Sequence, residues 1–233
     1  MPHPLLKVYG QLDGQVKQAI KGAGLKPSCK KGCSHCCYIM TAMHAVEGQV
    51  LAKAVMKMPN WREIAQRARE VSFKVMEFGH DRRAFFDAGV PCPLLDLKTN
   101  ECVAYEQRPS VCRLYMVTSD PVMCSPANSE PNVQIINTSY FEARLMKFCI
   151  EVANGVLILA PIPLMLLFSL PKAARSPEEE AYLRTLAEGL PDPVQWMKLH
   201  DEVHSKWSEE DPDAVKKAYR ESFAQVFGVP SRT

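Results

Sequence analysis

Four cysteines lie within nine residues near the start of the chain, in the pattern Cys29-x3-Cys33-x2-Cys36-Cys37. Spacers this short let successive thiolates turn toward one centre without ordering much of the chain. Gly32 helps that turn, and the neighbouring Lys30 and Lys31 favour the thiolate over the thiol. We therefore expect these four sulfur atoms to hold a metal ion or an iron–sulfur cluster.

A second group of cysteines follows at regular spacing: Cys92, Cys102, Cys112 and Cys124. We expect each of them at a strand end, in a turn or in a loop, where ligands from separate segments can converge. Arg108 and Arg113 again place positive charge beside sulfur, so they would orient the loop and balance the charge of the centre. Cys149 differs, since it lies between two large apolar residues and is expected to be a small buried hydrophobe.

The number and setting of the cysteines favour metal binding over disulfides. The N-terminus has no basic segment followed by an apolar one, so we predict a cytoplasmic protein rather than a secreted one. Cytoplasmic thiols are kept reduced, and nine cysteines in 233 residues could not all pair. We expect an iron–sulfur cluster or zinc.

Two motifs resemble a known family. The run from Cys29 to Cys37 is similar to the CxxxCxxCC signature of the YkgJ-type cysteine-cluster proteins, which are described as zinc- or iron-chelating domains. A CPxL segment at Cys92 and a C-x2-Y-x2-RP-x2-CR block from Cys102 to Arg113 resemble the second half of that family's pattern. The resemblance implies metal chelation but no particular reaction, and its motifs do not include Cys124.

The spacing leaves the number of metal sites open. Neighbouring side chains diverge, so we expect Cys36 and Cys37 to serve different metals, or one of them to stay outside the ligand shell. Eight thiols allow one four-iron cluster with spare thiols, two clusters, or two zinc sites of four thiolates each. Zinc modules usually carry paired C-x2-C knuckles, and only Cys33-x2-Cys36 has this form here. We therefore favour iron–sulfur over zinc.

Three other functions fit part of the pattern. A structural zinc module would use the metal for folding and present a surface to an unidentified protein partner. The Cys29-x3-Cys33-x2-Cys36 spacing also matches S-adenosylmethionine-dependent iron–sulfur enzymes, although their alternating strands and helices are not expected here. The C-x2-C pair alone fits a thiol–disulfide oxidoreductase, but no βαβ pattern surrounds it. His35, inside the first cysteine loop, is a further candidate, either as a metal ligand or as a hydrogen-bond donor to a ligating cysteine.

Composition argues against two classes of partner. The formal net charge is only +2 and no long basic stripe occurs, so we expect no nucleic-acid partner. The most apolar stretch, Gly155 to Leu170, is short and is interrupted by Pro161 and Pro163. We therefore expect a buried core segment there, not a membrane span.

Hydrophobic periodicity and capping residues predict a mostly α protein. Residues 1–128 would form an irregular, cysteine-rich metal-binding lobe with N-terminal helices and a small β-hairpin, and residues 129–233 a helical lobe, in two domains or one. Thr41 is the expected cap of the second helix. We expect helices at 5–23, 41–58, 61–86, 140–159, 176–189, 192–207 and 211–228, a hairpin at 92–105 and a short strand at 133–136.

Overall fold

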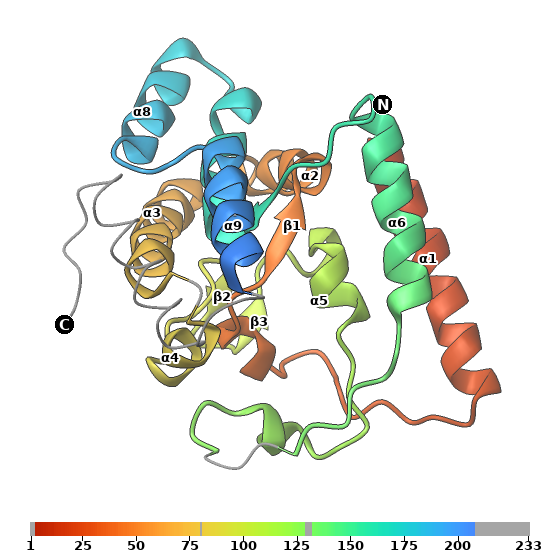
Figure 1. Cartoon of the computed structure of the whole chain (residues 1–233). Coiled ribbons are helices and arrows are strands. Elements are labelled where there is room, and N and C mark those ends of the chain that lie inside the picture. Colours follow the sequence, from red (N-terminus) through yellow and green to blue (C-terminus); the bar gives the residue numbers. More distant parts are fainter. Residues whose placement is uncertain (1–2, 80, 129–131, 208–233) are drawn as a thin grey trace.

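The computed structural model describes residues 3–79, 81–128 and 132–207, and it confirms a mostly helical fold (Figure 1). The α-helices are α1 (Pro4–Gly22), α2 (Ala45–Val55), α3 (Trp61–Phe78), α4 (Arg82–Asp87), α5 (Ser110–Leu114), α6 (Ser139–Val152), α7 (Ile162–Ser169), α8 (Pro177–Ala187) and α9 (Pro193–Trp207). The strands are β1 (Ala42–His44), β2 (Leu95–Asp96), β3 (Glu101–Cys102) and β4 (Leu159–Pro161). The 3-10 helices are η1 (His35–Tyr38), η2 (Tyr105–Gln107), η3 (Pro121–Cys124) and η4 (Pro171–Ala173).

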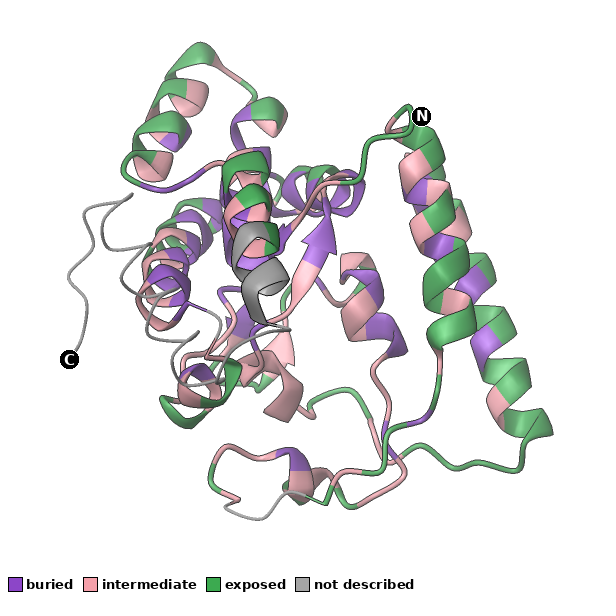
Figure 2. Ribbon diagram, viewed as in Figure 1, coloured by how far each residue is buried: buried purple, intermediate pink, exposed green. Residues whose placement is uncertain are grey.

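The main core lies where α7 packs against α2 and α3. Helix α7 is apolar on every side and almost wholly buried, as expected for a helix enclosed by its neighbours. Gly48 lets α2 approach α7 closely, because a Cβ atom there would lie 2.7 Å from Cγ of Met165. Figure 2 shows buried residues along α2, α3 and β1.

A two-stranded antiparallel sheet joins the two halves of the chain. Strand β1 pairs with β4, with Met43 opposite Ala160. The predicted helix start at Thr41 is therefore wrong, because residues 42–44 are extended and His44 is the helix cap. Its Nδ1 accepts from the Val46 amide at 3.0 Å. The pairing and the α7 contacts cross the predicted boundary between residues 128 and 129, and the division into lobes stays a prediction.

Two predicted helices are shorter than expected. The helix predicted at 61–86 breaks at Gly79, whose φ of 58° ends α3, and Asp81 caps α4 through the Ala84 amide. The helix predicted at 140–159 ends at Val152, because Asn154 and Gly155 both have positive φ.

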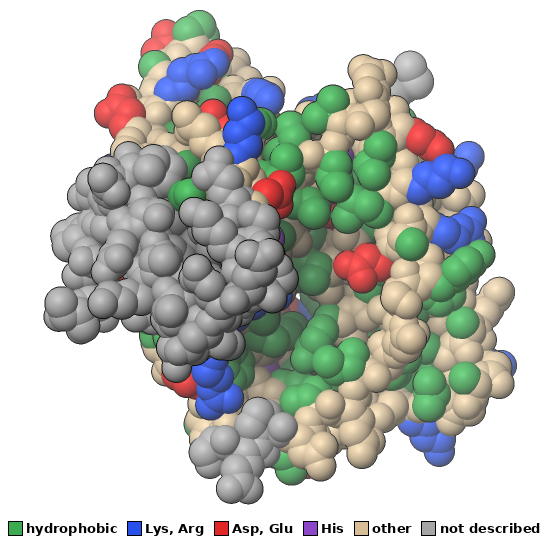
Figure 3. All heavy atoms as spheres, in the orientation of Figure 1, with side chains coloured by type: hydrophobic (Ala, Val, Ile, Leu, Met, Phe, Trp, Pro, Cys, Tyr) green, Lys and Arg blue, Asp and Glu red, His purple; other side chains and the backbone are tan. Residues whose placement is uncertain are grey.

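The apolar stretch predicted to be buried splits into two parts. Val156 and Leu157 are exposed, and Figure 3 shows hydrophobic side chains gathered on the face that includes the segment between α6 and β4. From Ala160 to Leu170 the chain is buried, apart from the partly exposed Phe168, so this part of the prediction is confirmed. No helix within the described ranges has both the length and the apolar character needed to cross a lipid bilayer.

Other expected elements appear with small changes. Strands β2 and β3 form the predicted hairpin, with Asn100 at φ 56° in its turn. Ser176 caps α8 as predicted, through the Glu179 amide at 3.2 Å. The strand predicted at 133–136 is reduced to a single bridge between Val117 and Ile135. The helix predicted at 211–228 lies outside the described residues.

A second, smaller core fixes α1 and α6 on α2 and α5. It contains Leu5, Tyr9, Leu145 and Cys149, and Cys149 is only 1% exposed. The prediction that this cysteine is a buried apolar side chain is confirmed.

Candidate metal centre

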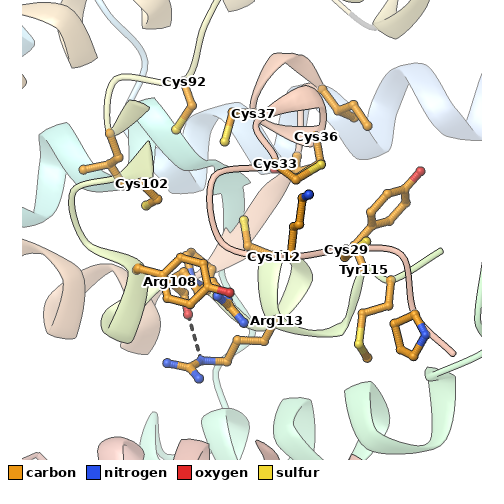
Figure 4. A pocket seen from close by; sticks show the side chains of 18 of the residues that line it. Cys29, Cys33, Cys36, Cys37, Cys92, Cys102, Arg108, Cys112, Arg113 and Tyr115 are labelled. Atoms are coloured by element: carbon orange, nitrogen blue, oxygen red, sulfur yellow. Dashed lines mark hydrogen bonds between the residues drawn. The ribbon is translucent and has the colours of Figure 1, made fainter. Parts of the chain in front are cut away.

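The predicted metal ligands lie on three segments of the chain, and Figure 4 shows those of the first two around one cavity. Seven of the eight thiols line one cavity of about 1020 Å³. They are Cys29, Cys33, Cys36, Cys37, Cys92, Cys102 and Cys112. The eighth, Cys124, is buried at the end of η3, which contacts η1. His35, the first residue of η1, is not among the residues lining this cavity.

The first segment is a loop that ends in η1. Gly32 has a φ of 85°, and this turn brings the Cys33 amide to the Lys30 carbonyl at 3.0 Å. The loop is tied to the chain beyond α5, since the Val117 amide lies 3.4 Å from the Cys29 sulfur and donates to it. The Ser28 amide also donates to the Val117 carbonyl at 2.8 Å.

The second segment contains the hairpin and α5. The Cys92 amide donates to the Cys37 carbonyl at 2.7 Å, which places the start of this segment beside η1. Cys102 pairs with Leu95 across the hairpin. Arg67 of α3 donates to the carbonyls of Cys92 and Leu95, at 3.2 Å and 2.8 Å. The hairpin is therefore anchored to the main helical core.

Sequence reasoning missed the carboxylate that positions α5. Glu47 of α2 is only 2% exposed, and it accepts from the Tyr9 hydroxyl at 2.8 Å and from the Ser110 amide at 2.6 Å. Ser110 is the first residue of α5, the helix that carries Cys112. Burial and the Glu47 carboxylate raise the pKa of Tyr9, so its hydroxyl keeps the proton that it donates. The sequence signal was a charged residue beside Val50 and Leu51 on an apolar helix face.

The two arginines of this block have different roles. Arg113 is 7% exposed and donates to Asp13 at 2.5 Å and to the carbonyls of Arg108 and Glu106. It therefore orients the loop, as expected. The Arg108 guanidinium stacks on the Tyr105 ring, 3.8 Å from the ring centroid. Its positive charge acts to lower the pKa of both Cys36 and Cys102. For Cys102 the effect of burial is larger, so the pKa of that thiol is raised. The Nε of Arg108 is buried without a hydrogen-bond partner among the described residues.

Most of the thiols are held in their neutral form by burial. Burial raises the pKa of Cys92 to about 12 and that of Cys124 to about 11, and it raises the pKa of Cys112 well above its usual value. Cys36 is the exception among these groups. The Cys37 thiol donates a hydrogen bond to Cys36, which lowers the Cys36 pKa to about 7 and raises that of Cys37.

The thiols surround the cavity without closing on one point. Among the side chains that the structure describes, no three His, Cys, Asp or Glu residues are gathered closely enough to enclose a metal ion. Soft sulfur donors on loops nevertheless fit zinc or an iron–sulfur cluster, and the unpartnered Nε of Arg108 fits an anionic metal–thiolate group. Binding would have to draw the loops together.

The comparison with known families agrees with this chemistry. Residues 28–139 match the family model called CxxCxxCC, a putative zinc- or iron-chelating domain. No curated protein and no solved structure matches the chain. The matched segment contains all eight candidate ligands, although three residues separate Cys29 from Cys33 where the model's name has two. The predicted resemblance to a cysteine-cluster family is therefore confirmed over residues 28–139.

Proposed function

We propose that the chain is a cytosolic iron–sulfur protein and that its eight loop cysteines hold the metal. The observation that carries this proposal is the gathering of seven thiols, from segments up to 83 residues apart, around one cavity (112 − 29 = 83). Packing alone does not explain such a set, because these thiols lie on loops, on a hairpin and on short helices. The proposed ligands are Cys29, Cys33, Cys36, Cys37, Cys92, Cys102, Cys112 and Cys124.

Ionisation of the buried thiols would require a bound cation. Metal ligands must be thiolates, yet burial raises the pKa of Cys92 and Cys112 and so opposes their ionisation. A metal cation offsets this cost, because it attracts each thiolate directly. A metal held by four thiolates keeps a net negative charge, and Arg108 beside the cavity can balance part of it.

Two observations favour iron–sulfur over zinc. Only Cys33 and Cys36 form the C-x2-C knuckle typical of zinc modules. The seven thiols are also spread around the cavity rather than gathered at one point, which leaves room for a cluster with its sulfide ions. When bound, such a cluster could transfer electrons.

The test is elemental analysis and an absorbance spectrum of the full chain purified without oxygen. We expect a brown protein that absorbs near ~400 nm and contains iron and acid-labile sulfide. The variant Cys33→Ala should lose metal, whereas Cys149→Ala removes a thiol from the second core and should keep it. A colourless protein with stoichiometric zinc would replace this proposal with the structural zinc module. A protein without either metal would refute metal binding.

A further inference from the structure

We propose that the eight thiols form two separate four-thiolate sites that meet at Cys36 and Cys37. The inner site would consist of Cys37, Cys92, Cys102 and Cys112, and the outer site of Cys29, Cys33, Cys36 and Cys124. This proposal rests on the proposed function and specifies which ligands share a metal centre.

The geometry of η1 separates the two adjacent cysteines. A 3-10 helix has about three residues per turn, so neighbouring side chains point about 120° apart. Cys36 and Cys37 are the second and third residues of η1. In Figure 4 the sulfur of Cys37 points toward Cys92, whereas Cys36 lies beside Cys33 on the other side. Two sites can therefore be served by one short helix.

The inner group is built on the main core. Cys92, Cys102 and Cys112 all pack against the core cluster of α2, α3 and α7, and no thiol of the outer group is among the residues that pack there. The hydrogen bond from the Cys92 amide to the Cys37 carbonyl places Cys37, the fourth thiol of the inner group, beside Cys92. Cys92 and Cys112 are also close enough to Cys37 to affect its ionisation.

The outer group is built on loops. The sulfur of Cys29 is fixed to the Val117 amide, and η3, which carries Cys124, contacts η1. Cys29, Cys33 and Cys36 are the thiols whose charges act on Cys124. Figure 4 places Cys29 with Tyr115, on the side of the cavity away from Cys92 and Cys102.

Ligand number assigns Cys36 to the outer site. Zinc in structural sites and iron–sulfur clusters are both held by four ligands. The inner group already has four thiols, while Cys29, Cys33 and Cys124 need one more. The charge of a Cys36 thiolate raises the pKa of thiols in both groups, as expected for a ligand that lies where two sites adjoin.

The experiment is a titration of the metal-free full chain with cobalt(II) alone, followed by thiolate-to-metal absorbance and by native mass spectrometry. We expect the wild type to bind about two ions per chain tightly, and Cys29→Ala and Cys124→Ala to bind about one each. Cys102→Ala should also bind about one, and Cys102→Ala combined with Cys124→Ala none. Cys149→Ala is the matched control and should bind as the wild type does.

Several results would overturn the division into two sites. One tight ion in the wild type would do so, and so would complete loss of binding in Cys124→Ala with the helical circular dichroism intact. Because the two outer variants leave the core untouched, they decide the question even if Cys102→Ala does not fold. A wild type that binds no cobalt, iron or zinc would instead refute the proposed function itself.

Discussion

The helical core and the cysteine segments are built by different forces. In the core, α7 buries apolar side chains against α2 and α3, and Leu164 and Leu166 are fully inaccessible to solvent. The cysteine segments have short elements, two-residue strands and partly exposed thiols. Each buried aliphatic side chain stabilises the core by about 1.5–3 kcal/mol, whereas a neutral thiol at the cavity contributes less. The core should therefore be stable by itself, while the cysteine segments should depend on metal.

Glu47 connects the two regions. It belongs to a core helix, yet its carboxylate accepts from the backbone of α5 and from Tyr9 of α1. We call this contact between Glu47, Tyr9 and Ser110 the Glu47 joint. Arg113 of α5 lies beside it, with its guanidinium 4.2 Å from the Tyr9 ring centroid. The backbone of α5, which carries Cys112, is thus held in place by the Glu47 and Arg113 side chains.

The largest change in stability should come from a substitution in the helical core. Leu164→Ala removes a side chain with 0% exposure and should lower the free energy of unfolding by about 2–5 kcal/mol. The loss should be similar in metal-free and metal-loaded protein, because it comes from lost apolar burial and not from a lost metal ligand. Urea unfolding of both forms measures it. A loss below ~1 kcal/mol in either form would mean that this core is not the source of stability.

The second largest change in stability should come from a substitution at the Glu47 joint. Glu47→Gln replaces one carboxylate oxygen by an NH₂ group, which then faces a donor, either the His44 amide or the Tyr9 and Ser110 pair. It should therefore cost about 1–3 kcal/mol of unfolding free energy and weaken metal retention. Metal content after dialysis against a chelator and urea unfolding measure the two results. Glu63→Gln is the control, because Glu63 is exposed on α3. Equal behaviour of the two variants would contradict the assigned role of Glu47.

The sequence predicted the elements whose signals are local. The hairpin, the Ser176 cap and the helix from Pro193 follow from turn and capping residues, and each lies within one short window. The break at Gly79 was missed because the apolar spacing continues through Phe78 and Phe85 on both sides of it. The pairing of β1 with β4 joins residues more than 110 positions apart, and each strand is too short to show a period.

The candidate site divides in the same way. Cysteine spacing indicated which thiols to consider, and the cavity brings seven of them together. Cysteine spacing could not indicate Glu47, because the hydrogen-bond partners of that carboxylate, Tyr9 and Ser110, are 38 and 63 residues away in the sequence. Nor could it separate the roles of Arg108 and Arg113, which depend on folded contacts rather than on spacing.

A third prediction concerns pH and a single thiol of the metal-free protein. Cys36 has a pKa lowered to about 7 by the hydrogen bond from Cys37, whereas burial raises that of Cys92 to about 12. Thiolate forms as pH rises through the pKa, so iodoacetamide should label Cys36 increasingly between about pH 6 and 8 and leave Cys92 unlabelled there. Peptide mass spectrometry reads the sites. Labelling of Cys92 before Cys36 would contradict this order.

The smallest effect should come from the surface. Arg83 and Asp87 form an exposed ion pair at 2.8 Å on α4, away from the Glu47 joint. Arg83→Ala should change the unfolding free energy by only about 0.3–0.5 kcal/mol and leave metal content unchanged. A larger loss, measured by the same urea titration, would show that α4 supports the hairpin more than its contacts suggest.

The most direct measurement is hydrogen–deuterium exchange of the full chain with and without its metal. We expect α2, α3 and α7 to be protected in both forms, because apolar burial stabilises them. Residues 28–37 and 92–124 should become strongly protected only in the metal-loaded form, as the thiolates draw their loops together. Equal protection of the cysteine segments in both forms would contradict the claim that metal holds this region.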